Sequence, residues 1–433
     1  MIGAGCCGLV AALAARECGV EVLVLERDAR PAGSSALSSG FVPAAGTRFQ
    51  RAAGVLDSPQ RMAADILAKN HGEADARVVE ALCNGSGPAI EWLADAHGVP
   101  FGLLEGFVYP GHGALRMHAV PEKTGAALVA ALERACVAAG VDILTLAQAV
   151  DLLADDARRV TGVRYRRPGG RLEEAGCQAL VLACSGFGGN PDMVRRYLPE
   201  VGAALYFGHA GNQGDAIRWG RELGADVRDM SAYQGHGSVA TPHGILITWA
   251  LMTEGGIQVN ARGERFSNEH QGYSEQCLPV LEQPGGVAWC IYDERLHRLG
   301  MTFPDYRSAA EAGAIQSAPE LPLLQRTLQE VARFAGGEKD PFGRDFTRHP
   351  GLAPPCYGIK VTGALFHTQG GLAVDERARV LDPSGKPLPN LYAGGGAARG
   401  VSGAQARGYL SGNGLLSAVG LGRLAGRNAA KDL

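Results

Sequence analysis

The sequence lacks several features that would place it in common classes of protein. Its net charge is only −3 and it has no basic run, so nucleic acid is not predicted as a partner. No apolar stretch is long enough to span a bilayer without charge or glycine, so no membrane span is predicted. The ten cysteines contain no CxxC pair and no metal-ligand spacing. We interpret them as buried thiols and predict a cytoplasmic location with no bound metal.

Glycine, by contrast, is abundant. The 433 residues include 62 glycines, many of them clustered between apolar segments. Such clusters are expected where the backbone wraps closely around a large ligand. The length suggests two to three domains, and a hydrophobic content of 46% is enough for substantial cores.

The first glycine-rich turn stands at the N-terminus. Gly3, Gly5 and Gly8 form a GxGxxG pattern, followed by an apolar helix, an apolar strand over residues 22–25 and then Glu26. This order is the dinucleotide-binding fingerprint. The first two glycines allow a tight turn against a pyrophosphate, and the third lets the helix pack on the strand. Free N–H groups of the helix then face the phosphates, and the acid can accept from ribose hydroxyls.

Only Met1 and Ile2 precede this turn, whereas a unit of this kind has a strand there. We therefore expect the first strand to be truncated. Because that strand is central in the sheet, its loss is expected to weaken folding and cofactor retention.

Further glycine-rich turns follow along the chain, and they lie toward both of its ends. They span residues 33–40, 183–190, 211–215, 394–396 and 412–414. Between about residues 233 and 355 the pattern changes to short strands mixed with helices, which indicates an inserted α+β domain. A cofactor domain interrupted by a cap explains why the turns lie on both sides of this insertion.

Together these motifs resemble the flavoprotein family of fumarate reductase, the succinate dehydrogenase flavoprotein subunit and the 3-ketosteroid dehydrogenases. The most specific matches are residues 259–269, with the sequence VNARGERFSNE, and residues 367–371, with the sequence HTQGG. The resemblance covers nearly the whole chain. It implies an α/β fold with a Rossmann-like, GR2-type FAD-binding domain over residues 1–230 and 367–433. An α+β capping domain over residues 231–366 would interrupt it.

The resemblance implies FAD as the cofactor. No histidine occurs in residues 33–40, where some relatives attach the flavin covalently, so non-covalent FAD is expected. The residues predicted to bind the cofactor are Gly3, Gly5, Gly8, Glu26, Arg27, Gly33, Ser34, Ser35, Ser39, Gly40, Val150, Ala183, Ser185, Gly186, Asp215, His367, Gly370, Gly395, Asn413, Leu415 and Leu416.

The substrate end departs from the fumarate reductase pattern. Family members clamp a dicarboxylate with cations, and the matching positions here hold uncharged residues such as Tyr273, Phe366 and Tyr409. Burying two carboxylates without cations would cost several kcal/mol each. A small, flat, apolar ketone is therefore the expected substrate. The residues predicted to contact it are His236, Thr248, Trp249, Met252, Phe366 and Gly412.

The segment 408–412 resembles that of the 3-ketosteroid 4-ene (5α) dehydrogenases, which implies a mechanism. Tyr409 and a backbone N–H near Gly412 would bind a ketone oxygen and stabilise its enolate. Tyr273, with Ser411 as relay, would remove the α-proton while a hydride passes to the flavin. A free tyrosine has a pKa of about 10 and needs help to act as a base, for which His270 is a candidate neighbour.

Two alternatives stay open beside this CH–CH dehydrogenase or enone reductase. One is a fumarate reductase-like enzyme acting on a dicarboxylate or another unsaturated acid, with Arg407, His236 and Arg116 as the clamp. The other is a degenerate, non-catalytic flavin-binding protein. The electron acceptor is unknown, and we assign no role to residues 109–112.

Overall fold

The computed structural model describes residues 1–433 and has a mixed helix-and-sheet architecture. Parallel strands surround the N-terminus: β1 (Leu23–Leu25) pairs with β5 (Asp142–Leu144), and β9 (Leu180–Leu182) pairs with β20 (Pro387–Ala393). Ile2 bridges β1 and β9. Its N–H donates to the Val181 carbonyl at 3.0 Å, and the N–H of Gly3 donates to the Leu25 carbonyl at 2.8 Å. Residues 1–3 thus occupy the position between these strands.

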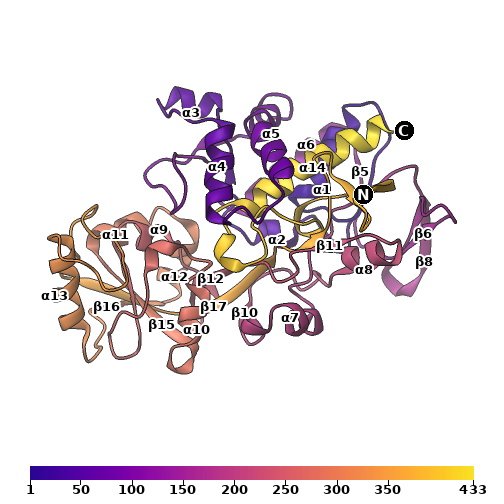
Figure 1. Cartoon of the computed structure of the whole chain (residues 1–433). Helices are drawn as coiled ribbons and strands as arrows, with labels where there is room; N and C mark the ends of the chain where they lie inside the picture. The colour runs from indigo at the N-terminus through magenta and orange to yellow at the C-terminus, as the bar shows by residue number, and fades with distance from the viewer.

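Helix α1 (Cys6–Arg16) follows this position and packs against the C-terminal helix α14 (Asn413–Lys431), as Figure 1 shows. Their backbones approach closely at two glycines of α14. A Cβ on Gly422 would lie 2.6 Å from the carbonyl oxygen of Cys7, and one on Gly426 would lie 2.0 Å from that of Ala11. Only glycine allows this contact. Because of it, the two ends of the chain meet in one core.

Further elements belong to the segments before residue 230 and after residue 366. The helices are α2 (Gly33–Ala36), α3 (Arg48–Ala52), α4 (Pro59–Lys69), α5 (Ala76–Asp95), α6 (Gly125–Ala138), α7 (Pro191–Tyr197) and α8 (Asp215–Glu222). An antiparallel sheet consists of β6 (Gln148–Ala154), β7 (Val160–Arg166) and β8 (Leu172–Gly176). Shorter pairings join β2 (Val42–Pro43) and β3 (Gly102–Leu103) to β4 (Met117–Ala119), β11 (Val227–Arg228) to β18 (Gly371–Leu372), and β19 (Arg379–Leu381) to β20.

A seven-stranded, mostly antiparallel sheet forms the other part of the molecule. Its order is β13 (Ile245–Leu246), β12 (Tyr233–Ala240), β17 (Cys356–Thr368), β15 (Val287–Asp293) and β14 (Ile257–Val259). Strands β10 (Leu205–Tyr206) and β16 (Ile315–Ser317) also pair with β17. The long strand β17 runs from this lobe toward the centre of the molecule (Figure 1), so it crosses the expected domain boundary after residue 366.

Helices cover this sheet and bury a core of their own. They are α9 (Ala250–Thr253), α10 (Cys277–Leu281), α11 (Glu294–Gly300), α12 (Pro304–Glu311) and α13 (Leu324–Ala335). In Figure 1, α11 and α13 lie at the end of the molecule opposite both termini. The core also takes in Phe41, Phe107 and Met117 from the first part of the chain, so the two parts share an apolar contact.

Residues 259–269, one of the two most specific motifs of the sequence, include a buried ion-pair network. The carboxylate of Glu269 is fully buried and accepts hydrogen bonds from Arg265 at 2.9 and 2.8 Å and from Arg344 at 3.0 Å. Burial alone would raise the pKa of Glu269, but the two guanidinium groups hold it at about 2. Arg265 also bonds Asp340 at 2.6 Å. This ion-pair network fixes the loop that leads to Tyr273.

No helix combines the length and hydrophobicity needed to cross a bilayer. The ten cysteines are all free thiols, and seven of them are buried as predicted. Cys18 is exposed and Cys177 and Cys184 are half-buried, so for these three the prediction of burial is wrong. They lie at the end of α1, in a turn after β8 and in the turn after β9, where the chain leaves the core.

Candidate functional site

One large cavity joins the glycine-rich turns to the seven-stranded sheet, and 48 residues line it. All three residues predicted to be catalytic are among them. So are most residues predicted to bind cofactor or substrate, namely Gly3, Gly5, Glu26, Arg27, Gly33, Ser34, Ser35, Ser39, Gly40, Ala183, Ser185, Asp215, His367, Gly395, Leu415, His236, Thr248, Trp249, Phe366 and Gly412. The fold therefore brings together residues from both ends of the chain.

At one end of the cavity, the N-terminus of α1 is open. Its N-cap residue, Gly5, supplies no side-chain bond to the helix. Gly8 packs so tightly that a Cβ there would lie 1.8 Å from the carbonyl oxygen of Gly3. The carboxylate of Glu26 accepts from the Ala4 N–H at 2.8 Å and from the Asp28 N–H at 2.9 Å. These contacts hold the turn and the acid in fixed positions beside the cavity.

The turn over residues 33–40 lies at the same end of the cavity. Ser35 Oγ accepts from the N–H of Cys6 at 3.2 Å, and Ser34 Oγ accepts from the N–H of His209 at 3.0 Å and from Asn212 Nδ2 at 2.7 Å. Arg27 donates to the Gly211 carbonyl at 2.9 Å. The second and fourth glycine-rich turns are thereby tied to the first strand and helix.

The middle of the cavity meets the N-terminus of α14. Gly412 caps this helix with a φ of 87°, a left-handed value that favours glycine. Ser417, one turn into the helix, lines the cavity with a buried hydroxyl that has no partner within the protein. A buried polar atom without a partner points to a polar ligand group there. The positive end of the helix dipole and this hydroxyl fit a ring system that carries polar atoms and takes up negative charge on reduction, such as a flavin.

Seven predicted contact residues do not line the cavity. Gly8, Gly186 and Gly370 permit close packing instead, since a Cβ on each would lie 2.1 Å or less from an atom of Gly3, Thr368 or Asp229. In β6 the neighbours Gln148 and Ala149 line the cavity and Val150 does not, and the pairing of β6 with β7 shifts register between Ala149 and Asp151, at Val150. Leu416 and Met252 are buried in apolar cores, and Asn413 is buried and donates to Ser402 Oγ at 3.1 Å.

The far end of the cavity is lined by aromatic rings that follow one another in a stack. Phe207 stacks on Phe366 with ring centroids 4.7 Å apart, Phe366 on His236 at 5.0 Å, and His236 on Tyr273 at 4.6 Å. Trp249 meets His236 edge-on at 5.9 Å. Flat apolar walls of this kind suit a flat apolar ligand.

Two tyrosines and a serine meet where this stack reaches α14. The rings of Tyr273 and Tyr409 lie 6.1 Å apart. Burial raises the pKa of Tyr273 to about 12, while hydrogen bonds with Ser411, Tyr409 and the N–H of Gly412 act in the opposite direction. Burial and the neighbouring Tyr273 raise the pKa of Tyr409, whose hydroxyl accepts from the Gly414 N–H at 3.3 Å. This cluster can bind an oxygen and exchange a proton.

Two buried histidines of the cavity, His236 and His367, are neutral near pH 7. Burial lowers the pKa of His236 to about 3 and that of His367 to about 4. His236 Nδ1 accepts from the N–H of Ser238 at 3.2 Å, which leaves the proton on Nε2. His270, the candidate helper of Tyr273, donates instead to the Thr253 carbonyl at 2.9 Å and does not line the cavity. That part of the prediction is wrong.

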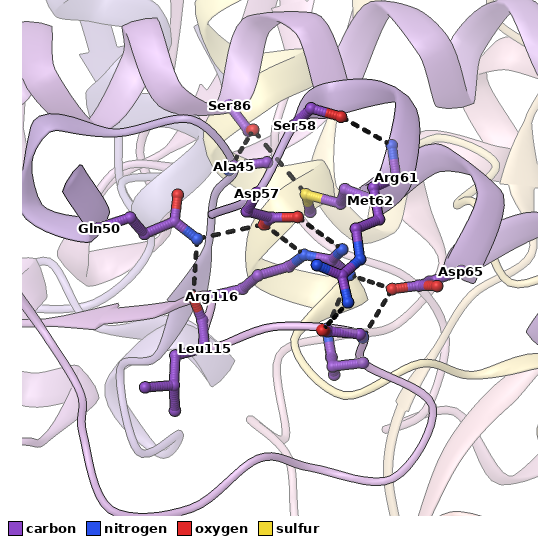
Figure 2. A network of polar contacts seen from close by, with 12 residues as sticks. Ala45, Gln50, Asp57, Ser58, Arg61, Met62, Asp65, Ser86, Leu115 and Arg116 are labelled. Atoms are coloured by element: carbon purple, nitrogen blue, oxygen red, sulfur yellow. Dashed lines mark hydrogen bonds and ion pairs between the residues drawn. The ribbon is translucent and has the colours of Figure 1, made fainter. Parts of the chain in front are cut away.

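No arginine or lysine lines the aromatic end. Arg27, at the opposite end, is the only one among the lining residues. Arg407 is exposed and outside the cavity. Arg116 lies between Asp57 and Asp65 (Figure 2), at 2.7 and 2.6 Å, so its charge is already paired. Neither arginine is placed to clamp a carboxylate in this structure.

Several residues that line the cavity were not predicted as contact residues. At the aromatic end these are Tyr109, Phe207, Gln234 and Leu246. Gln234 alternates with His236 along β12, a signal that could have found it. Asp215, predicted to bind the cofactor, is the first residue of α8, and Gly214 with a φ of 80° is the N-cap of this helix.

Comparisons with known proteins agree with this geometry. A family model described as FAD binding domain matches residues 1–415. A probable fumarate reductase of Shewanella frigidimarina is 28% identical over 447 residues, which cover all of this chain and 74% of that protein. The open conformation of a flavocytochrome c3 fumarate reductase is similar in structure, with a TM-score of 0.83, 28% identity, and coverage of 100% of this chain and 77% of that chain.

A second solved structure resembles the chain over almost its whole length. It is the 3-ketosteroid-Δ4-(5α)-dehydrogenase from Rhodococcus jostii in complex with 4-androstene-3,17-dione. The TM-score is 0.77 and the identity 26%, and the match covers 99% of this chain and 95% of that chain.

Proposed function

The chain belongs to the FAD binding domain family, and from this membership we propose that it is an FAD-dependent oxidoreductase acting on a carbon–carbon bond beside a ketone. A cyclic, largely apolar ketone or enone is the proposed substrate. The observation that carries the proposal is the aromatic end of the cavity, where Tyr273 and Tyr409 stand and no arginine or lysine does. A dicarboxylate there would lose its hydration without gaining a cation.

The residues that hold FAD are proposed from the cavity. The open N-terminus of α1 and the turn over residues 33–40 would bind the phosphates, Glu26 the ribose, and the N-terminus of α14 with Ser417 the ring system. When bound, FAD supplies two-electron redox chemistry to the substrate. We propose that it is held non-covalently by residues 1–230 and 367–433, with residues 231–366 as the cap.

The protein's own groups would bind the substrate and move its proton. The hydroxyl of Tyr409 and the N–H of Gly412 would donate to the ketone oxygen and stabilise the charge that develops on it. Tyr273 would take the α-proton in desaturation or return it in reduction, with Ser411 as its hydrogen-bonded relay. The stacked rings of His236 and Phe366 would exclude water and orient the flat substrate.

The experiment is to photoreduce the purified flavoprotein and to add enones and unsaturated acids separately. We expect cyclic enones to reoxidise the flavin and fumarate to leave it reduced. A Tyr273→Phe variant should keep its yellow colour and lose about 10²- to 10⁴-fold in rate. Reoxidation by fumarate but by no enone would refute the proposal.

Reduction of an unsaturated acid is the second candidate, because relatives such as the fumarate reductase of Shewanella frigidimarina match the whole chain. In that case a cation would have to reach the substrate from outside the present lining. Loss of fumarate turnover in Arg407→Ala would favour this candidate.

A further inference from the structure

A buried polar network stands behind the segment that carries the two proposed oxyanion donors. His112, in the loop after residue 108, brings its Nε2 to 2.9 Å from the carbonyl oxygen of Ser411. A carbonyl oxygen only accepts, so Nε2 carries the proton and donates. Nδ1 of the same ring lies 3.5 Å from Nη1 of Arg116, which only donates, so Nδ1 is the acceptor. Both ring nitrogens are therefore assigned by their partners.

The network behind His112 consists of paired charges. Figure 2 shows the Arg116 guanidinium between two carboxylates: it donates to Asp57 at 2.7 and 2.9 Å and to Asp65 at 2.6 Å. Asp65 also accepts from the N–H of Gly113 at 2.7 Å, so the loop carrying the histidine is tied to α4. Gln50 donates to Asp57 at 3.1 Å. Burial and the adjacent guanidinium lower the pKa of His112 to about 4, which keeps the ring neutral near pH 7.

The bonded carbonyl belongs to the same peptide unit as the N–H of Gly412. That N–H makes no hydrogen bond to another backbone group. It lowers the pKa of both Tyr273 and Tyr409, and all three residues line the cavity. Since a peptide unit is planar, its C=O and N–H point in opposite directions. A donor on the carbonyl therefore fixes the direction of the N–H and polarises it, as in other hydrogen-bonded chains.

We propose that His112 is a positioning residue: its bond to the Ser411 carbonyl aims and strengthens the Gly412 N–H as an oxyanion donor in the reaction chamber. The inference rests on the proposed function, since it assigns this N–H to a ketone oxygen. It adds a residue outside the cavity lining to that site. The loss of an oxyanion donor costs about 10²- to 10³-fold in kcat. Removing only the His112 bond to the Ser411 carbonyl leaves the Gly412 N–H in place, so it should lower kcat less, roughly 10- to 100-fold.

The test compares His112→Phe, which removes the donor, with His112→Gln, whose side-chain amide can restore it. With a cyclic enone as substrate, we expect kcat to fall about 10- to 100-fold in the first variant, with KM little changed, and to recover in the second. Asn70→Ala is the matched control. Asn70 is buried and donates to the Val401 carbonyl at 2.9 Å, in the same segment but outside the oxyanion site.

A second measurement needs no turnover. A nitrophenol, whose own absorbance reports its ionisation, serves as an enolate mimic in the chamber. Its bound pKa should be higher in His112→Phe than in wild type by about 1 to 2, which matches a 10- to 100-fold weaker anion site. It should be at the wild-type value in His112→Gln and in Asn70→Ala. A purely structural role for His112 would lower the melting temperature without moving this pKa.

The outcomes separate the two claims. Wild-type protein that turns over no enone would refute the proposed function and, with it, this inference. Wild-type turnover together with unchanged kcat and an unchanged phenol pKa in His112→Phe would refute this inference alone. If His112→Phe fails to fold, a His112→Gln variant with a fully wild-type melting temperature but a kcat as low as that of Tyr409→Phe would also overturn it.

Discussion

The proposed base makes a strong prediction about pH. Tyr273 is buried, which raises its pKa to about 12, and its bonds with Ser411, Tyr409 and the Gly412 N–H pull in the other direction. A base must be deprotonated to accept the α-proton, and below the pKa each pH unit raises the deprotonated fraction about tenfold. For desaturation of a ketone, kcat/KM should therefore rise about tenfold per pH unit, or about 10³-fold from pH 7 to pH 10.

The reverse direction should behave differently. In enone reduction Tyr273 gives up a proton, so the protonated form is the active one, and this form predominates at every pH below about 12. The rate constant of enone reduction should then be flat over the same range. Dye-linked assays of desaturation and anaerobic reoxidation of the photoreduced flavin measure the two directions on one preparation.

Two variants show whether the slope belongs to this residue. Tyr273→Phe should abolish the pH slope together with most of the rate. Tyr409→Phe should keep the slope and lower the rate by about 10²- to 10³-fold, because it removes an oxyanion donor and leaves the base in place. A desaturation rate that does not change with pH in wild type, or a slope that survives in Tyr273→Phe, would refute the reasoning.

Three further predictions test the cofactor site, the cap and the clamp. Gly8→Val should yield protein without the yellow flavin absorbance, because even a Cβ would lie 1.8 Å from the Gly3 carbonyl; full FAD content would contradict this packing. Glu269→Gln should destabilise the protein by about 3–5 kcal/mol in denaturant melts, since Arg344 loses a buried partner. In wild type, the stabilisation that ionised Glu269 provides is present above pH about 4.5 and is lost as pH falls through about 2, because folding lowers the pKa of this carboxylate. Arg407→Ala should leave enone turnover within about twofold, since the side chain is exposed and outside the cavity, and a tenfold loss of enone turnover would contradict this placement.

At the cofactor end the constraints on the sequence are local. Gly3, Gly5, Gly8 and Glu26 stand in one unit whose helix and strand follow directly, so spacing alone defines the geometry. Val150 is a predicted contact residue at this end that does not line the cavity. Val150 directly follows the lining residues Gln148 and Ala149, at an irregularity in the pairing of β6 with β7 that the sequence pattern does not show.

The substrate end is harder to predict because its contacts join distant segments. Phe207 lies in the segment after β10 and lines the cavity beside Phe366, on which it stacks. No local sequence pattern predicts a contact between these two residues. The role of Arg116 is also hard to predict, because its partner is distant in the sequence. As a sequence element it is an unpaired cation and a candidate clamp, whereas in the fold its charge is paired with Asp57, 59 positions away.

That paired arginine also explains how an active chamber can do without cations of its own. A positive group beside the substrate would stabilise an enolate, but it would equally favour a carboxylate ligand. Here the positive charge sits behind the backbone, neutralised by two carboxylates, and contacts the chamber only through neutral His112 and a peptide dipole. Such a dipole stabilises charge that develops in the reaction and offers little to a ligand that arrives already charged and must be desolvated. We propose that an arrangement of this kind favours a neutral ketone over an acid.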